Sequence, residues 1–165
     1  MAHYFLFPEK DATIYSNPLR KTLNTGIDEI LTISDEDYFG RKYPSRVLIQ
    51  FKTSEIKDVA SLKLYETEHF NLSVNQNLEV YPLAEGPWNN GTGRFENRPL
   101  TSDGVSWDFK DNSTTQTSWT LSGFGTGITG SWSASAAGGG SWYTGSGFEV
   151  NRTYGYGEKC DVSID

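Results

Sequence analysis

The sequence contains few residues of the kinds that crosslink a chain or ligate a metal. Among its 165 residues there is one cysteine, Cys160, and there are two histidines, His3 and His69. A single cysteine excludes a disulfide within the chain and a thiolate zinc site that one chain could build. We therefore expect no metal and no cofactor, and a chain that is made in a reducing cytosol.

Basic residues and long apolar runs are also scarce. Lys and Arg number 14 against 21 Asp and Glu, and the net charge is −7. Because no basic stripe is present to displace counterions from a phosphate backbone, nucleic acid is not an expected partner. No run of about 18 apolar residues occurs, and the first residues carry no basic stretch. We expect neither a membrane span nor a cleaved signal peptide.

Helix signals are nearly absent, whereas strand signals recur. The only helix candidate is a single turn at Thr53–Val59. Short runs rich in β-branched and aromatic residues alternate with turn segments, which is typical of antiparallel sheets. The sequence therefore predicts an all-β chain folded as an antiparallel β-sandwich or jelly roll. The expected strands are Tyr4–Phe7, Ala12–Tyr15, Glu29–Ile33, Arg46–Phe51, Ser61–Glu66 and Leu78–Pro82.

The apolar positions of these strands supply the expected core. Leu62 and Leu64 alternate with polar neighbours, as a strand with one buried face requires. In the next strand upstream, Val47 and Ile49 point away from Leu48, which indicates that both faces are covered in part. The expected core consists of Phe5, Ile14, Ile30, Val47, Ile49, Phe51, Leu62, Leu64, Leu78 and Val80.

The second half of the chain differs in composition. All five tryptophans and 15 of the 17 glycines lie at or after Gly86, and Ser-Trp recurs at positions 106, 118, 131 and 141. These intervals are too short and uneven for a solenoid or propeller repeat. We expect one domain with core strands at 1–100, a long region of Gly/Ser/Thr/Trp-rich arms or loops at 101–147 and a returning strand at 148–165.

Two acidic groupings are candidates for a catalytic or a metal-binding site, and neither has the features that such a site needs. Glu66 and Glu68 share one face of a predicted strand beside His69, but a catalytic pair needs one desolvated carboxylate, and strand ends are usually solvated. Asp35–Asp37 resembles half of a calcium loop without its central glycine and final glutamate. We interpret both as solvated acidic segments, with Asp35–Pro44 as a turn. No nucleophile motif or phosphate loop occurs either, so we expect a protein that is not an enzyme.

Aromatic side chains are the best candidates for contact with a ligand or a partner. Flat aromatic rings stack on sugars and dominate protein interfaces. The alternative is that each tryptophan pins its own loop to the sandwich or fills a subunit interface. The candidate contact residues lie among small polar residues that offer little cover; they are Trp107, Trp119, Trp132, Trp142 and Tyr143.

Several segments resemble the DNRLRE-type domain, a β-sandwich related to carbohydrate-binding modules. Asp11–Tyr15 is similar to the opening strand of that family, and Leu23–Gly26 is similar to its Asn-x-Gly turn. Arg46–Phe51 is similar to its Arg-x-Leu-Ile-x-Phe strand, and Ala60–Tyr65 is similar to its Ala-x-Leu-x-Leu-Tyr strand. The resemblance covers about residues 11–100 and implies a β-sandwich fold.

A tryptophan-containing block, called here the tryptophan block, extends the resemblance and relates the chain to one variant of the family. Pro87–Pro99 follows the outline of the family's block, with Asn89 and Asn90 in place of an acidic residue and Phe95 where tryptophan is common. Together with Asp103–Trp107, this variant is similar to virion structural proteins of contractile-tailed phages of marine bacteria, especially cyanophages.

The resemblance implies a non-enzymatic virion structural protein that acts through protein–protein contacts. The protein would decorate the capsid or form part of the tail or baseplate, and the particle would be assembled in the host cytoplasm. Its partners would be other virion proteins or copies of itself. The alternative is a carbohydrate-binding module on a phage adhesion device or a cell surface, with a surface glycan as its ligand.

The last residues look like an interrupted strand. Cys160–Asp165 is similar to a segment of the family that leads into further strands, and Val162 and Ile164 alternate with polar residues. An unpaired strand edge is unfavourable in isolation. The sequence therefore predicts that a longer polypeptide or a neighbouring subunit supplies the missing strands.

Overall fold

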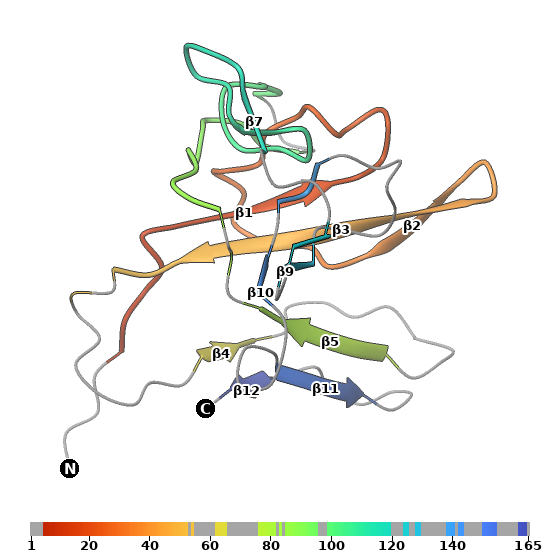
Figure 1. Ribbon diagram of the computed structural model, residues 1–165, viewed down its shortest axis with the longest axis vertical. Helices are drawn as coiled ribbons and strands as arrows, with labels where there is room; N and C mark the ends of the chain where they lie inside the picture. Colours follow the sequence, from red (N-terminus) through yellow and green to blue (C-terminus); the bar gives the residue numbers. More distant parts are fainter. Residues whose placement is uncertain are drawn as a thin grey trace.

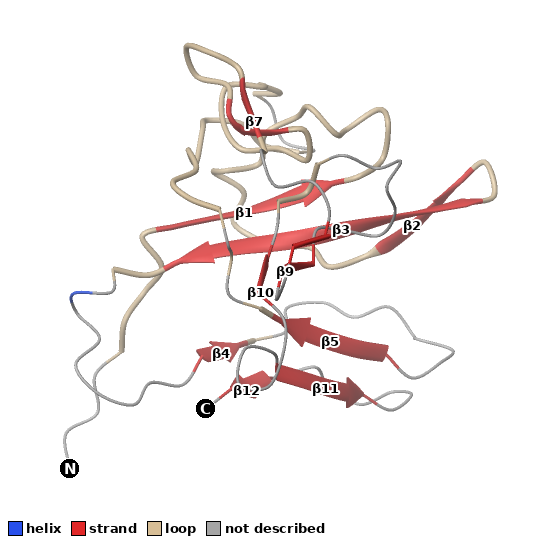
Figure 2. Ribbon diagram, in the orientation of Figure 1, coloured by secondary structure: helices blue, strands red, loops and turns tan. Residues whose placement is uncertain are grey.

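Strands dominate the part of the chain that the structure describes. Within it no α-helix occurs, so the fold is all-β as predicted (Figure 2). All the strand pairs there are antiparallel. The structure, a computed structural model, describes residues 5–52, 54, 62–65, 76–81, 83, 85–95, 99–119, 124–125, 128–129, 138–140, 142–143, 150–154 and 162–164.

The central sheet consists of three strands in the order β1-β3-β2. They are β1 (Lys10–Tyr15), β2 (Asp35–Tyr38) and β3 (Arg41–Gln50). The long strand β3 pairs with β1 over Ser45–Gln50 and with β2 over Arg41–Pro44. Figure 1 shows that the β2–β3 hairpin therefore extends past the end of β1 and projects from the sheet.

This hairpin occupies the segment that was predicted as a turn, and that prediction is wrong. The actual turn is the dipeptide Phe39-Gly40, whose φ angles of 52° and 71° are those of a two-residue hairpin turn. The acidic residues Asp35–Asp37 belong to β2, which among the described strands pairs with β3 alone. Charged side chains are typical of such edge strands, because they oppose pairing with another chain.

Two other predicted strands are also wrong within the described residues. Phe5–Phe7 and Glu29–Ile33 are irregular, with no ladder partner. The second segment is held to β1 by a side chain instead, because the Thr32 N–H donates to Thr13 Oγ1 at 2.9 Å. Ser45 Oγ of β3 also donates to Thr32 O, so this apolar run lies against the sheet through side-chain hydrogen bonds without joining its ladder.

The remaining strands form smaller antiparallel groups. β4 pairs with β12, β5 with β11 and β6 with β7, and β8, β9 and β10 form a group of three. Figure 1 shows the β4–β12 and β5–β11 pairs below the central sheet. The bounds are β4 (Leu62–Leu64), β5 (Gln76–Val80), β6 (Phe109–Asp111), β7 (Thr117–Ser118), β8 (Phe124–Gly125), β9 (Ile128–Thr129), β10 (Trp142–Tyr143), β11 (Val150–Tyr154) and β12 (Val162–Ile164).

The last strand has a partner within the chain. Val162–Ile164 pairs with Leu62–Leu64, so the backbone groups on one edge of β12 have partners in β4. β11 likewise returns to pair with β5. Whether a further strand reaches the other edge from a longer chain or another subunit stays a prediction.

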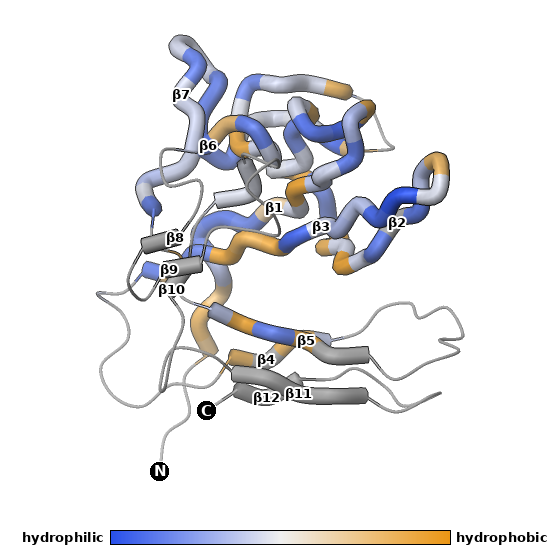
Figure 3. The backbone as a smooth tube through the Cα atoms, turned by 45° about the vertical axis from the view of Figure 1, so that its right-hand side comes forward, coloured by the Kyte–Doolittle hydropathy of each residue, from blue (hydrophilic) through white to orange (hydrophobic). Residues whose placement is uncertain are grey.

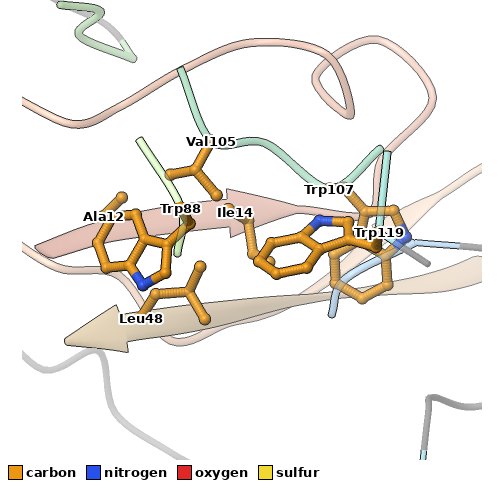
Figure 4. Close-up of a cluster of buried hydrophobic side chains, with 7 residues drawn as sticks. All are labelled: Ala12, Ile14, Leu48, Trp88, Val105, Trp107 and Trp119. Atoms are coloured by element: carbon orange, nitrogen blue, oxygen red, sulfur yellow. The ribbon is translucent and has the colours of Figure 1, made fainter. Parts of the chain in front are cut away.

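The main core gathers side chains from the central sheet and from later segments. Ala12 and Ile14 of β1 and Leu48 of β3 are buried. Figure 4 shows Trp88 toward the Ala12 end of this cluster and Trp107 and Trp119 toward the other end. Ile14 is confirmed as a core residue.

Other core predictions need correction. Phe5 and Ile30 are 80% and 54% exposed, and the segments that carry them are irregular. In β3 the buried apolar residue is Leu48, whereas Val47 and Ile49 are half-buried on the opposite face. The face of β3 that was expected to lie in the core is thus the one turned away from the tryptophans.

A second apolar cluster lies with the smaller strand pairs. Figure 3 shows hydrophobic stretches on β4 and β5 as well as on β3. All four of its described members were expected in the core; they are the half-buried Leu62, Leu64, Leu78 and Val80.

The segment after residue 100 contributes to the main core. Val105, Ser106 and Trp107 are 0%, 0% and 3% exposed. The backbone of Asn24 also forms a bridge with Thr101. The start of the Gly/Ser/Trp-rich region is therefore part of the folded body.

Candidate functional site

One buried asparagine organises the segment that carries the tryptophan block. Asn24 is completely buried, and its Nδ2 donates to the carbonyl oxygens of Asn90 at 2.6 Å and Val105 at 2.9 Å. Its Oδ1 accepts from the N–H groups of Gly93 at 2.7 Å and Gly26 at 3.2 Å. Both donors and both acceptor positions of the amide are used. Asn24 thus holds the tryptophan block against the turn at Asn24-Thr25-Gly26.

Glycines surround Asn24 because no side chain fits there. A Cβ at Gly26 would lie 1.8 Å from the carbonyl oxygen of Asn90, and a Cβ at Gly93 would lie 2.2 Å from that of Asn24. Contacts this short require the backbone itself to move. The Asn-x-Gly turn and the glycines of the block therefore form one packed unit.

A threonine pair fixes the same turn to β1. The Thr25 hydroxyl donates to Thr13 O at 2.6 Å, and the Thr13 N–H donates to Thr25 Oγ1 at 3.0 Å. Both residues are at most 1% exposed. One side chain therefore satisfies two backbone groups that a neighbouring strand would otherwise satisfy.

Phe95, the residue that replaces a tryptophan of the resembled family, is part of an aromatic stack. Its ring lies 4.6 Å from the ring of Tyr15 with an interplanar angle of 24°. The Arg20 guanidinium carbon lies 4.1 Å from the Phe95 ring centroid. This stack ties the tryptophan block to the end of β1, which is a structural role.

Trp107 lies in the core and leaves no ring face for a partner. It is 3% exposed, and the Arg46 guanidinium lies 4.5 Å from its ring centroid. Arg46 also donates to Gly139 O, and the Gly139 N–H donates to Trp107 O. Burial lowers the pKa of Arg46 to about 9, so the guanidinium stays charged at neutral pH.

The other predicted contact residues fall into two groups. Trp119 is 6% exposed and its Nε1 donates to Ser106 O at 3.0 Å, so it too pins its segment to the core. For Trp107 and Trp119 the burial favours the alternative interpretation, in which a tryptophan fixes its own loop. Trp142 and Tyr143 form β10, and their contact role stays a prediction. Trp132 lies outside the described residues.

A shallow polar groove lies on one side of Trp88. It has a volume of about 380 Å³ and is lined by Glu9, Lys10, Pro87, Trp88, Asn89, Asn90 and Asp111. The Lys10 Nζ lies 4.4 Å from the Trp88 ring centroid and donates to Trp88 O. Desolvation lowers the pKa of Lys10 although Glu9 opposes the change. Amide, carboxylate and ammonium groups here can donate to and accept from hydroxyl groups.

A smaller depression, called here the Trp88 depression, is also lined by this tryptophan. Its volume is about 190 Å³, and a Cβ at Gly86 would meet nothing within 4 Å. The carboxylate of Glu85 is nearly buried beside it, 4.0 Å from Lys110 Nζ. The lining residues are Ile49, Gln50, Leu83, Glu85, Gly86 and Trp88.

Two aspartates stabilise loops. Desolvation raises the pKa of Asp103, but hydrogen bonds from the Thr101 and Thr92 side chains and from backbone N–H groups outweigh it and lower the pKa overall. The Thr101 hydroxyl donates to Asp103 Oδ1 at 2.6 Å. Hydrogen bonds from the Ser113 backbone and side chain lower the pKa of Asp111. Asp111 Oδ1 also accepts from Asn89 Nδ2 at 3.2 Å, so this carboxylate joins its loop to the polar groove.

Exposed apolar side chains form the most conspicuous surface feature of the described residues. Phe5, Phe7 and Phe39 are 80%, 85% and 89% exposed. Sequence reasoning placed Phe5 in the core and did not single out Phe39. The sequence does contain a pattern that indicates an aromatic residue in a hairpin turn, since in Tyr38-Phe39-Gly40 an aromatic residue directly precedes a glycine between two extended runs.

The acidic groupings considered from the sequence gain no support as a metal or catalytic site. Within the described residues no three His, Cys, Asp or Glu side chains are placed to hold a metal ion. Glu66, Glu68 and His69, with His3 and Cys160, lie outside those residues. The described part also contains no helix with the length and apolarity that a membrane crossing needs.

Comparison with models of known families, with curated proteins and with solved structures finds no match. The resemblance to the DNRLRE-type domain therefore stays an expectation from the sequence.

Proposed function

We propose that this chain is a non-enzymatic structural protein of a virion, in capsid decoration, tail or baseplate, and that it acts through protein–protein contacts. The observation that carries the proposal is the exposure of three phenylalanines to 80% or more on two separate segments. Aromatic residues, phenylalanine included, are enriched in protein–protein interfaces relative to the rest of the surface.

The proposal includes a β-sandwich as the rigid body behind these contacts. The central sheet would form one layer, and the β4–β12 and β5–β11 pairs would form the other. The cluster of Leu62, Leu64, Leu78 and Val80 supplies apolar side chains for the space between such layers. Buried Trp88, Trp107 and Trp119 would then stiffen the body, which leaves the exposed phenylalanines to meet partners.

The partners would be other virion proteins or copies of this chain, joined during assembly in the host cytoplasm. The resemblance of the Pro87–Trp107 block to phage structural proteins supports this choice. The test is mass spectrometry of density-gradient-purified particles from the source culture. We expect the chain in the particle fraction at a constant ratio to the major structural proteins. Its absence from particles would overturn the proposal.

A carbohydrate-binding module is the second candidate, and the polar groove beside Trp88 is the observation in its favour. Asn89, Asn90, Asp111 and Lys10 place hydroxyl-binding groups around one tryptophan. A glycan array separates the two functions. Binding that is lost in Asn89→Ala would favour the module, and an array without hits would favour the structural role.

A further inference from the structure

The tryptophan block contains an Asn-Gly dipeptide, the sequence in which asparagine loses its side-chain amide most readily. The dipeptide is Asn90-Gly91. Because glycine has no side chain to shield its backbone nitrogen, this nitrogen can attack the carbonyl carbon of the preceding side chain. Asparagine counts among the thermolabile residues of proteins. The dipeptide is therefore a candidate site of spontaneous covalent modification.

The reaction at such a dipeptide needs the chain and water alone. The Gly91 nitrogen gives up its proton to water and attacks Asn90 Cγ, so that a C–N bond forms and the carbonyl electron pair moves to Oδ1. The pair then returns, the bond from Cγ to Nδ2 breaks, and Nδ2 takes up a proton and leaves as ammonia. Water opens the resulting succinimide ring and gives aspartate or isoaspartate. One water is consumed and one ammonia is released, with no change of oxidation state.

The fold uses both residues of the dipeptide, so the labile sequence has a structural reason. Gly91 has a φ of 75°, and a Cβ there would lie 2.5 Å from Asn24 Oδ1. Asn90 Nδ2 donates to Gly26 O, and Asn90 O accepts from Asn24 Nδ2 at 2.6 Å. The dipeptide thus joins the tryptophan block to the turn at Asn24-Thr25-Gly26.

The same contacts oppose the reaction. Closure of the succinimide ring moves the Asn90 side chain and its peptide plane, so the hydrogen bonds to Gly26 O and from Asn24 Nδ2 have to break. The side chain is also tightly packed, since a Cβ at Gly26 would lie 3.0 Å from Asn90 Cγ. The nucleophile is held as well, because the Gly91 N–H donates to Asn89 Oδ1 at 3.2 Å. Loss of its proton would cost that hydrogen bond.

The environment of Asn90 Oδ1 opposes the reaction most directly. This oxygen is closed off from solvent, and within the described part of the chain no donor lies within hydrogen-bond distance of it. Attack on Cγ places a negative charge on Oδ1, and donors aimed at such an oxygen are what enzymes use to stabilise it. A buried charge without a partner is strongly unfavourable. The folded state therefore gives the intermediate no stabilisation.

We propose that Asn90-Gly91 is a deamidation site that is closed in the folded chain and reacts when the tryptophan block separates from the turn at Asn24. Local openings of this kind occur in folded proteins below the free energy of global unfolding. The product has a carboxylate that cannot donate to Gly26 O, and it puts a charge where Oδ1 is closed off from solvent. Each opening that ends in deamidation therefore weakens this contact permanently in that copy. The inference does not depend on the proposed virion role.

The first experiment follows Asn90 in the purified chain at mildly alkaline pH, in buffer and in a series of urea concentrations. Peptide mapping by mass spectrometry measures the loss of the amide, and chromatography separates the aspartate and isoaspartate peptides. We expect the rate in buffer to be at least about tenfold below the rate in the urea that unfolds the chain, and to rise with the open fraction, because only open molecules react. Equal rates in buffer and in unfolding urea would show that the fold does not close the site.

A pair of asparagine variants tests whether the contact with Asn24 closes the site. Asn24→Ala removes the donor to Asn90 O and should accelerate the loss of the Asn90 amide in buffer at least about tenfold. Asn112→Ala is the matched control, since it removes one exposed hydrogen bond to Ser102 O, and it should react at the wild-type rate. Equal rates in the two variants would contradict the proposal. The urea series on the wild-type chain gives the same test without a substitution.

The consequence of the modification is measured on Asn90→Asp, which has the side chain of the aspartate product. Its urea midpoint at neutral pH should be lower than that of Asn112→Asp, the matched control, because it loses the donor to Gly26 O and gains a charge at a closed-off atom. Equal midpoints would refute the lasting weakening. None of these measurements depends on the recovery of the chain in purified particles, so this proposal and the proposed function can fail separately.

Discussion

At the scale of single residues, Asn24 joins three segments of the chain through one buried side chain. Its amide makes four hydrogen bonds, three of them buried and the one to Asn90 half-buried, to backbone groups of Gly26, Asn90, Gly93 and Val105. Asn24→Ala leaves these groups without a partner, and each unsatisfied group costs about 1–3 kcal/mol. We expect the free energy of unfolding in urea to fall by at least about 3 kcal/mol.

Asn112→Ala is the matched control for this substitution. The Asn112 side chain donates one exposed hydrogen bond to Ser102 O, so its loss should cost less than about 0.5 kcal/mol. Similar losses in the two variants would show that Asn24 is not a hub.

Asp103 gives the molecule an acid-sensitive loop. Desolvation opposes the shift, but the hydrogen bonds from Thr101 and Thr92 leave the pKa of Asp103 below its ordinary value. A lowered pKa stabilises the fold fully above the unfolded value of about 3.9, and this contribution is lost as the pH falls through the folded value. Below about pH 4, the thermal midpoint of Asp103→Asn should therefore fall less steeply than that of wild type. Thr92→Val should lie between them, and identical slopes would refute this assignment.

At the scale of elements, the turn at Gly26 is the least tolerant position. A Cβ there would lie 1.8 Å from Asn90 O, whereas a Cβ at Gly86 would meet nothing within 4 Å. Gly26→Ala should cost about 3 kcal/mol or prevent folding, because overpacking of a rigid site commonly costs about 1–3 kcal/mol. Gly86→Ala should stay within about 0.5 kcal/mol of wild type. Circular dichroism with thermal melting measures both, and equal midpoints would mean that the turn can shift.

The strands that the sequence predicted correctly are those whose apolar pattern agrees with their neighbours. Ala12 and Ile14 alternate with polar residues, and Leu48 lies in an apolar run, so β1 and β3 were recognisable. β2 was not, because Asp35–Asp37 has the composition of a solvated turn and forms a strand only through pairing with β3. The run Glu29–Ile33 has the composition of a strand, but side-chain hydrogen bonds hold it beside the sheet.

The candidate site was less predictable than the fold, because exposure is a property of tertiary structure. Trp107 and Trp119 have small polar neighbours in the sequence, which suggests bare rings, yet Arg46 and Gly139 from distant segments cover Trp107. Phe39 looks like an ordinary apolar residue until its hairpin is seen to project from the sheet. Composition therefore located the aromatics without telling the buried ones from the exposed ones.

At the scale of the whole molecule, the aromatics divide between stability and contact. Trp88, Trp107 and Trp119 lie inside one cluster that joins the central sheet to the tryptophan block. The most exposed phenylalanines lie on the N-terminal segment and on the hairpin. A body stiffened by tryptophans can hold exposed rings in fixed positions, which lowers the entropy cost of association.

This division predicts two classes of tryptophan variants. Trp107→Ala and Trp119→Ala remove core volume and should lower the free energy of unfolding by about 3–5 kcal/mol each. Trp132→Ala and Trp142→Ala should keep the unfolding midpoint and weaken assembly, since these residues are expected to meet a partner. Urea denaturation and sedimentation of the four variants at one concentration measure both effects. If Trp132→Ala and Trp142→Ala unfold as readily as the core variants, all the tryptophans serve stability, and contact is left to the phenylalanines.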